Sequence, residues 1–281
     1  MAWHEWPLIV FTVLAQTSVG AFLVLATMML TKQLSLAAEK RLHQAMFGLW
    51  AIMGVGFLAS IMHLGSPLRA MNALNMLGSS WLSNEIATGS AFFALGGMFW
   101  LLSVLKLGSV AIRKAFMVGA MLVGVAFMYA MTMVYMIDTV PTWYTPLTPA
   151  AFMITMLISG TALAQLLLSV AKHDSTVANK LLPIMGLFGM FAVVMVVMLL
   201  SSHLASIETS VTTALAVVPE HTSLQLTRIV LTVAAMVLWL LPVVQRKKVT
   251  VLPMAMAFTM IVVAELIGRG MFYGMHLSAG M

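Results

Sequence analysis

Residues Ala45–His63, AMFGLWAIMGVGFLASIMH, form an apolar run that ends at a histidine. A helix rises 1.5 Å per residue, so about 20 apolar residues suffice to cross the hydrocarbon layer of a bilayer. The run is followed by LGSPLR and then, at residues 79–85, by SSWLSNE, after which another apolar run begins. Two membrane helices are therefore predicted to enclose a connection that is rich in groups able to move protons.

The whole chain has the composition of an integral membrane protein. Of its 281 residues, 62% are hydrophobic and 8% are charged, whereas a soluble domain carries about 25% charged residues. The net charge of +6 does not indicate nucleic-acid binding, because the basic residues lie in short connections, as orientation signals do. The chain has no cysteine, so it cannot itself supply thiolates to an iron–sulfur cluster or a metal.

Eight apolar runs have spanning length, which predicts an all-α integral membrane protein with eight transmembrane helices. No polar stretch between them is long enough for a second fold, so residues 1–281 are expected to form a single polytopic domain. The predicted helices are Leu8–Leu30, Ala45–His63, Ile86–Leu105, Ala115–Ile137, Ala150–Ala171, Leu181–Ser202, Thr227–Val244 and Leu252–Tyr273.

The basic residues predict the orientation of these helices. Eleven of the 14 Lys and Arg residues lie in every second connection, and the opposite connections are longer and more acidic. By the positive-inside rule the basic connections face the cytoplasm, so both termini face outward. The eleven are Lys32, Lys40, Arg41, Lys106, Arg113, Lys114, Lys172, Lys180, Arg246, Lys247 and Lys248.

A short internal sequence similarity bears on the arrangement of the helices. Phe47-Gly-Leu-Trp precedes His63, and Phe188-Gly-Met-Phe precedes His203 at nearly the same distance. This similarity would fit two parallel four-helix halves, but chance explains so short a match equally well.

His63 and Glu85 flank the connection between the second and third predicted helices. Imidazole can accept a proton near neutral pH and pass it on, and a carboxylate can act in the same way. Each residue also has a structural alternative: His63 could satisfy carbonyl groups at a helix end, and Glu85 could favour the first turn of a helix capped by Ser83. The presence of Arg69 in the same connection favours a functional role, because capping requires neither the histidine nor the arginine.

The last predicted helix carries Glu265, Arg269 and Tyr273 at intervals of four residues. This spacing places the three side chains on one face, so that Glu265 and Arg269 can pair. A structural ion pair is the favoured interpretation, and the three residues are kept as possible supports of a site at the outer end.

Two chemistries compete for these residues. A haem between facing helices needs axial histidines, but no predicted helix carries an interior histidine; a haem at the outer face is not excluded by spacing. The histidines that could serve as axial ligands of a haem are His43, His63, His203 and His276.

A lipid-soluble quinol needs an apolar crevice, an acceptor for each hydroxyl proton and an exit to water. A histidine and a carboxylate at the interface supply the last two. The electrons would then have to leave to a partner that carries cofactors.

At these residues the sequence resembles the membrane-anchor subunit of the anaerobic dimethyl sulfoxide reductase family. The resemblance extends over essentially the whole chain, and its motifs are specific. The stretches that carry it are Trp3–Pro7, His63–Asn72, Leu82–Ile86, Ile137–Tyr144 and Glu265–His276.

The resemblance implies an eight-helix anchor that oxidises menaquinol and holds no haem, iron–sulfur cluster or metal of its own. It implies an iron–sulfur subunit and a molybdopterin catalytic subunit as partners, and a location in the bacterial inner membrane with both termini in the periplasm. The quinol-binding residues of the family carry over to His63, Gly65, Arg69 and Glu85, with His63 and Glu85 as proton acceptors. Because quinol would be oxidised on the side where its electrons are used, this step alone should build no proton gradient.

A secondary transporter without a redox role is the alternative from another class. Glu85, Glu265 and Arg269 would then couple ion movement, and a pair of helices broken near mid-membrane would be expected. Gly96-Gly97 lies within the third predicted helix, but no convincing second interruption accompanies it.

Overall fold

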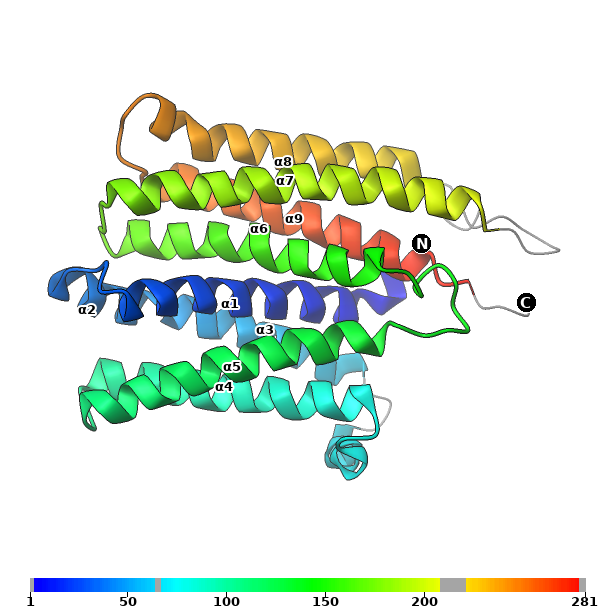
Figure 1. Cartoon of the computed structure of the whole chain (residues 1–281), viewed down its shortest axis with the longest axis horizontal. Helices are drawn as coiled ribbons and strands as arrows, with labels where there is room; N and C mark the ends of the chain where they lie inside the picture. Colours follow the sequence, from blue (N-terminus) through cyan, green and yellow to red (C-terminus); the bar gives the residue numbers. More distant parts are fainter. Residues whose placement is uncertain (1–2, 64–66, 208–220, 278–281) are drawn as a thin grey trace.

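The computed structural model describes residues 3–63, 67–207 and 221–277 and is all-helical over these ranges. Its long helices lie side by side as a bundle (Figure 1). The helices are η1 Trp3–Glu5, α1 Trp6–Leu30, α2 Leu36–Ala45, α3 Phe47–His63, η2 Pro67–Met76, α4 Trp81–Leu105, α5 Val110–Val134, α6 Leu147–Val170, α7 Thr176–Ala205, α8 His221–Val244 and α9 Val251–Gly274.

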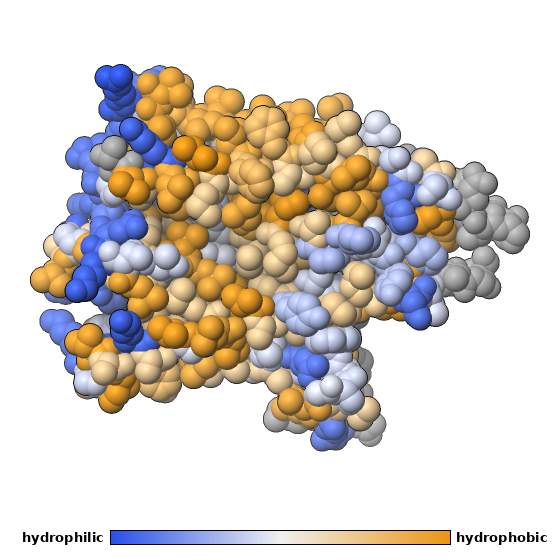
Figure 2. Space-filling model, in the orientation of Figure 1, coloured by the Kyte–Doolittle hydropathy of each residue, from blue (hydrophilic) through white to orange (hydrophobic). Residues whose placement is uncertain are grey.

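The described residues contain eight helical segments that are long and apolar enough to cross a membrane, which confirms the predicted number. The second span joins α2 and α3 into one segment, Leu36–His63. An apolar belt covers the middle of the bundle, and hydrophilic residues gather at its ends (Figure 2). Each of the other seven spans is one continuous helix, so the described residues lack the paired mid-membrane breaks expected of the transporter alternative.

Several helices begin earlier than the apolar runs that predicted them. α5 begins at Val110 rather than Ala115, and α4 begins at Trp81 rather than Ile86. The added turns contain polar or charged residues such as Arg113. A helical turn needs only its backbone hydrogen bonds, so hydropathy alone places the start of a helix too late.

Helix α1 lies at the centre of the bundle, between α6 and α3 (Figure 1). Gly20 on α1 and Gly160 on α6 bring these two helices into close contact, because a Cβ atom at Gly20 would lie 2.2 Å from the carbonyl oxygen of Met156. Small residues allow this kind of close helix packing in membrane proteins. The interior that α1 forms is partly polar, since Thr12, Gln16 and Thr17 are fully buried.

The four basic connections share one design. After α1, α4, α6 and α8, a Lys or Arg adopts the left-handed conformation, with φ between 53° and 57°. In each case the following residue donates a backbone hydrogen bond to the carbonyl group five residues before it, which closes the helix as a Schellman motif. The next helix is preceded by a serine or threonine at its N-cap. The four left-handed residues are Lys32, Lys106, Lys172 and Arg246.

The start of α1 and the end of α9 lie at the same end of the bundle, opposite the four basic connections (Figure 1). This arrangement is the one expected of an even number of spans. The side of the membrane that each end faces stays a prediction, as does the division into two four-helix halves.

Candidate functional site

His63 is the last residue of α3, as predicted, and its side chain is 41% exposed. Its Nδ1 atom lies 3.4 Å from Oε2 of Glu5, which immediately precedes α1. The contact has the length of an ion pair without the alignment of a hydrogen bond. The other carboxylate oxygen of Glu5 lies 3.6 Å from Nε2 of the exposed His4. The N-terminal segment therefore places a carboxylate beside the imidazole of His63.

Glu85 lies in the second turn of α4, at the same end of the bundle as His63. The structural alternative, in which Ser83 caps this helix, is wrong. Ser80 occupies the N-cap position, and its carbonyl group accepts the first helical hydrogen bond, from the amide of Asn84 at 3.0 Å. Ser83 is therefore inside the helix and buried. Glu85 is too far along α4 to serve the first turn, so capping does not account for it.

The Glu85 side chain is only 4% exposed, and its Oε1 atom has no hydrogen-bond partner among the described residues. The carboxyl group interacts electrostatically with the hydroxyl groups of Tyr135 and Tyr273, which are hydrogen-bonded to each other. These tyrosines follow α5 and lie on α9, respectively. Glu85 therefore faces the bundle interior, where it retains an unused acceptor.

His63 and Glu85 do not contact each other directly in the described part of the protein. His63 meets Glu5 at the surface, whereas Glu85 is close to the tyrosine pair inside the bundle. Gly65 lies outside the described residues. Arg69 belongs to η2, but its side chain lies outside what the structure describes.

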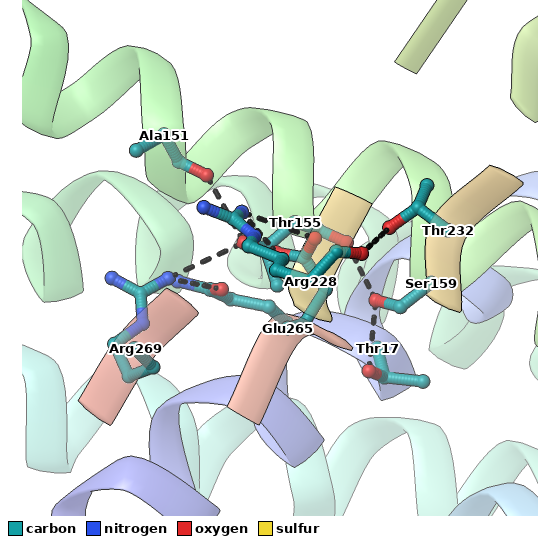
Figure 3. Close-up of polar contacts among 9 residues, drawn as sticks. Thr17, Ala151, Thr155, Ser159, Arg228, Thr232, Glu265 and Arg269 are labelled. Atoms are coloured by element: carbon teal, nitrogen blue, oxygen red, sulfur yellow. Dashed lines mark hydrogen bonds and ion pairs between the residues drawn. The ribbon is translucent and has the colours of Figure 1, made fainter. Parts of the chain in front are cut away.

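Glu265 does not form the expected ion pair with Arg269. Its partner is Arg228 on α8, whose Nη2 atom lies 3.2 Å from both carboxylate oxygens (Figure 3). Room for the guanidinium comes from Gly268, where a Cβ atom would lie 2.5 Å from Cζ of Arg228. The four-residue spacing did place Glu265 and Arg269 on one face, but the helix packed against that face supplied a cation in better position.

Arg269 is nevertheless connected to Glu265 through Thr155 on α6. The Thr155 hydroxyl donates to Glu265 Oε2 at 2.6 Å and accepts from Arg269 Nη2 at 3.5 Å (Figure 3). Arg269 also donates to Gln16 Oε1 at 2.9 Å, and its guanidinium stacks on the ring of Phe152 with 3.5 Å between Cζ and the ring centroid. The arginine is 4% exposed, so these contacts hold its charge within the bundle.

The polar residues of α9 therefore form a connected interior cluster. Glu265 and Arg269 occupy its centre, and Tyr273 extends it one turn farther to Tyr135, beside Glu85. Sequence reasoning missed the members that lie on other helices, Gln16, Tyr135, Thr155 and Arg228. Their signal was visible as polar side chains within apolar runs, but nothing in the sequence showed that they converge.

The other histidines have separate environments. His203 Nε2 lies 3.4 Å from the carbonyl oxygen of Pro141. The ring of His276 packs edge-on against Trp143, and His43 lies at the basic end of the bundle, on α2. Among the described residues, no group of three or more His, Cys, Asp or Glu side chains could hold a metal ion.

Comparison of the sequence with known proteins identifies a family. The family model described as "DMSO reductase anchor subunit (DmsC)" matches residues 1–275. The protein is 46% identical to the C subunit of the anaerobic dimethyl sulfoxide reductase of Escherichia coli K12 over 280 residues, which cover 99% of this sequence and 97% of the relative.

Two further relatives match over the same extent, 99% of this sequence and 97% of the relative. They are the YnfH subunit of an anaerobic dimethyl sulfoxide reductase from Escherichia coli K12, at 44% identity, and the C subunit of the anaerobic dimethyl sulfoxide reductase from Haemophilus influenzae, at 37% identity. The eight helices of spanning length among the described residues, together with these anchor-subunit relatives, identify a multi-pass inner-membrane protein. It belongs to the family of membrane-anchor subunits of dimethyl sulfoxide reductase.

Proposed function

We propose that this protein binds and oxidises menaquinol at the bundle end that carries His63 and Glu85, and that this end faces the periplasm. The electrons pass to an iron–sulfur subunit and then to a molybdopterin catalytic subunit, both of which the protein anchors to the membrane. Support for a respiratory role comes from the relatives, which are subunits of anaerobic dimethyl sulfoxide reductases.

The observation that carries the proposal is the buried carboxyl group of Glu85, which has an acceptor atom without a partner among the described residues, at the same bundle end as the half-exposed His63. Leaving a polar group buried and unpaired costs roughly 1–3 kcal/mol. A ligand hydroxyl that donates to this oxygen would remove that cost. The lack of direct contact between His63 and Glu85 suits a quinol, whose two hydroxyl groups lie on opposite sides of its ring.

In this proposal the two acceptors take different routes to water. Oxidation removes two electrons and two protons from menaquinol. His63 accepts one proton and, being partly exposed, releases it directly to the aqueous phase, with Glu5 stabilising the imidazolium. Glu85 accepts the second proton inside the bundle beside Tyr135 and Tyr273 and then relays it outward to the aqueous phase. Gly65 allows close approach of the quinol ring, and Arg69 favours the ionised form of Glu85.

The variants His63→Arg and Glu85→Gln test the assignment in the assembled complex. Menaquinol-dependent reduction should fall by about 10²–10⁴-fold in each, the usual contribution of a positioned acid or base. Reduction driven by an artificial donor that feeds electrons to the partner subunits should be unchanged. Co-purification of those subunits shows that the complex has assembled.

Asp138→Asn is the matched control, since it removes an exposed carboxylate at the same bundle end. This control should retain normal menaquinol oxidation and normal quenching of a fluorescent menaquinol analogue, whereas loss of His63 should abolish the quenching. Unchanged turnover in His63→Arg and Glu85→Gln, with the complex intact, would reject both roles.

A further inference from the structure

A pocket of about 190 Å³ opens at the basic end of the bundle, between α2 and the end of α4. It lies at the opposite end from His63 and Glu85, so the proposed quinol chemistry does not use it. Its polar lining comes from α2 and from the end of α4, and consists of Glu39, Lys40, His43, Gln44, Ser103 and Lys106.

The charges around the pocket favour an anion. Lys40 and Lys106 contribute two positive charges against the single negative charge of Glu39. Arg113, in the first turn of α5, is close enough to interact electrostatically with His43. The pocket therefore has a positive balance even when Glu39 is ionised.

A histidine ring also lines the pocket. The Nε2 atom of His43 is buried and has no hydrogen-bond partner among the described residues. The ring is fixed by an edge-on contact with Phe99, and the backbone carbonyl of the same residue accepts a 2.8 Å hydrogen bond from Trp100 Nε1. The His43 ring, held in this way, forms part of the pocket wall beside the two lysines.

Apolar side chains lead from the pocket into the membrane belt. Leu36 and Val104 line the pocket and are exposed. Farther toward the middle of the bundle, exposed Phe47 packs on Trp100, and exposed Phe93 packs on rings of α3. A molecule with a charged head in the pocket would thus have an apolar surface beneath it between α3 and α4, as a phospholipid requires.

We propose that the pocket formed by Lys40, His43, Ser103 and Lys106 binds the phosphate group of an anionic phospholipid, whose acyl tail lies along Phe47, Trp100 and Phe93. Basic pockets between membrane helices are suited to anionic headgroups because charge attraction adds to burial of the acyl tail. The site depends on insertion of the protein in a bilayer and is independent of the proposed quinol oxidation.

A second cavity at the same end provides an internal comparison. It has a volume of about 290 Å³ and is lined by Lys172, His173, Asp174 and Lys248, among others. Here Lys248 Nζ lies 2.9 Å from Asp174 Oδ2, so the aspartate takes up one of the two lysine charges. Asp174 has a lowered pKa because Lys248 donates a hydrogen bond to its carboxylate. The lysine and carboxylate charges of the two linings balance alike, but here Lys248 is already held by an ion pair, so among the described residues this cavity offers a phosphate one free lysine and can serve as a control.

The test measures lipid retention by the purified complex. The complex in neutral detergent is mixed with equal amounts of phosphatidylglycerol and phosphatidylcholine, and the lipids that stay bound are identified by native mass spectrometry. The intact complex should retain phosphatidylglycerol preferentially. The variant Lys40→Gln/Lys106→Gln should lose this preference by about 25-fold, roughly fivefold for each lysine. The control Lys172→Gln should keep it.

Three outcomes would overturn the proposal. The intact complex could retain both lipids equally, or Lys172→Gln could lose the preference as much as the double variant does. Inorganic phosphate at millimolar concentration could also displace the bound phosphatidylglycerol, which would assign the pocket to a soluble anion. Lipid retention is measured in the absence of menaquinol. A negative result in this test therefore leaves the quinol assignment unaffected, and a negative result in the quinol test leaves the lipid proposal unaffected.

Discussion

Nδ1 of His63, at the end of α3, lies 3.4 Å from Oε2 of Glu5, which comes 58 positions earlier in the sequence. The N-terminal segment therefore belongs to the candidate site. The sequence motif between the second and third spans contains His63 but gives no sign of Glu5. A carboxylate at this distance can stabilise an imidazolium, so within the proposed function Glu5 acts through His63 and not on the quinol itself.

The variant Glu5→Gln should slow menaquinol oxidation by about fivefold, because a partly exposed ion pair contributes at most roughly 1 kcal/mol. The loss should appear mainly in kcat, since the amide retains a similar shape and polarity near the quinol. Steady-state kinetics of the assembled complex measure both constants. His4→Gln removes the exposed imidazole on the other side of Glu5 and should have no effect. Equal rates in Glu5→Gln and the unaltered protein would remove Glu5 from the site.

The effects of replacing Arg228 and Glu265 on the stability of the protein should depend on each other, because the two side chains form an ion pair. Glu265→Gln leaves the guanidinium without its counter-charge in a buried position and should destabilise the protein by about 3–5 kcal/mol. The double variant Arg228→Met/Glu265→Gln removes both charges and should be more stable than Glu265→Gln alone. Thermal unfolding of the detergent-solubilised protein compares the variants. Additive losses in the double variant would contradict the coupling.

The close packing of α1 against α6 should not tolerate a side chain at Gly20. A Cβ atom there would lie 2.2 Å from a backbone oxygen of α6, and backbone cannot move aside as a flexible side chain can. Gly20→Ala should therefore destabilise the protein by about 1–3 kcal/mol. Gly97→Ala, where a Cβ atom meets nothing within 4 Å, should be neutral or slightly stabilising. Thermal unfolding distinguishes the two, and similar effects of both changes would show that packing is not the cause.

At the left-handed positions of the basic end, a glycine variant of the protein should be more stable than an alanine variant. Lys172 has φ of 53°, a conformation in which a Cβ atom costs roughly 1–2 kcal/mol. Lys172→Gly and Lys172→Ala both remove the charge, so their difference isolates the backbone term. Lys172→Gly should unfold at the higher temperature by the equivalent of about 1 kcal/mol. An alanine variant as stable as the glycine variant would indicate that the connection relaxes out of this conformation.

The architecture was largely readable from the sequence. Each spanning helix must satisfy its own backbone hydrogen bonds and cover itself with apolar side chains, so eight helices appear as eight apolar runs. The placement of His63 at the end of α3 followed in the same way, because a helix that leaves the apolar layer ends near its first polar residues. The start of α4 was misplaced since polar residues such as Asn84 are helical as well.

The candidate site was only partly readable. His63, Glu85 and the face formed by Glu265, Arg269 and Tyr273 follow from local spacing, because 3.6 residues per turn fixes which side chains share a face. Which partner each would find was not fixed. Glu265 pairs with Arg228 from α8, and Arg269 turns to Gln16 on α1.

The sequence by itself determined the membrane class, the number of spans and the residues able to carry protons, since these depend on composition and on distances along one helix. Only the tertiary structure decided that Glu5 lies beside His63, that Glu85 faces the tyrosine pair, and that Arg228 neutralises Glu265. Such contacts join helices far apart in the sequence. They depend on how each helix is rotated and packed against its neighbours, and small residues such as Gly20, Gly160 and Gly268 set that packing by determining where two surfaces can approach.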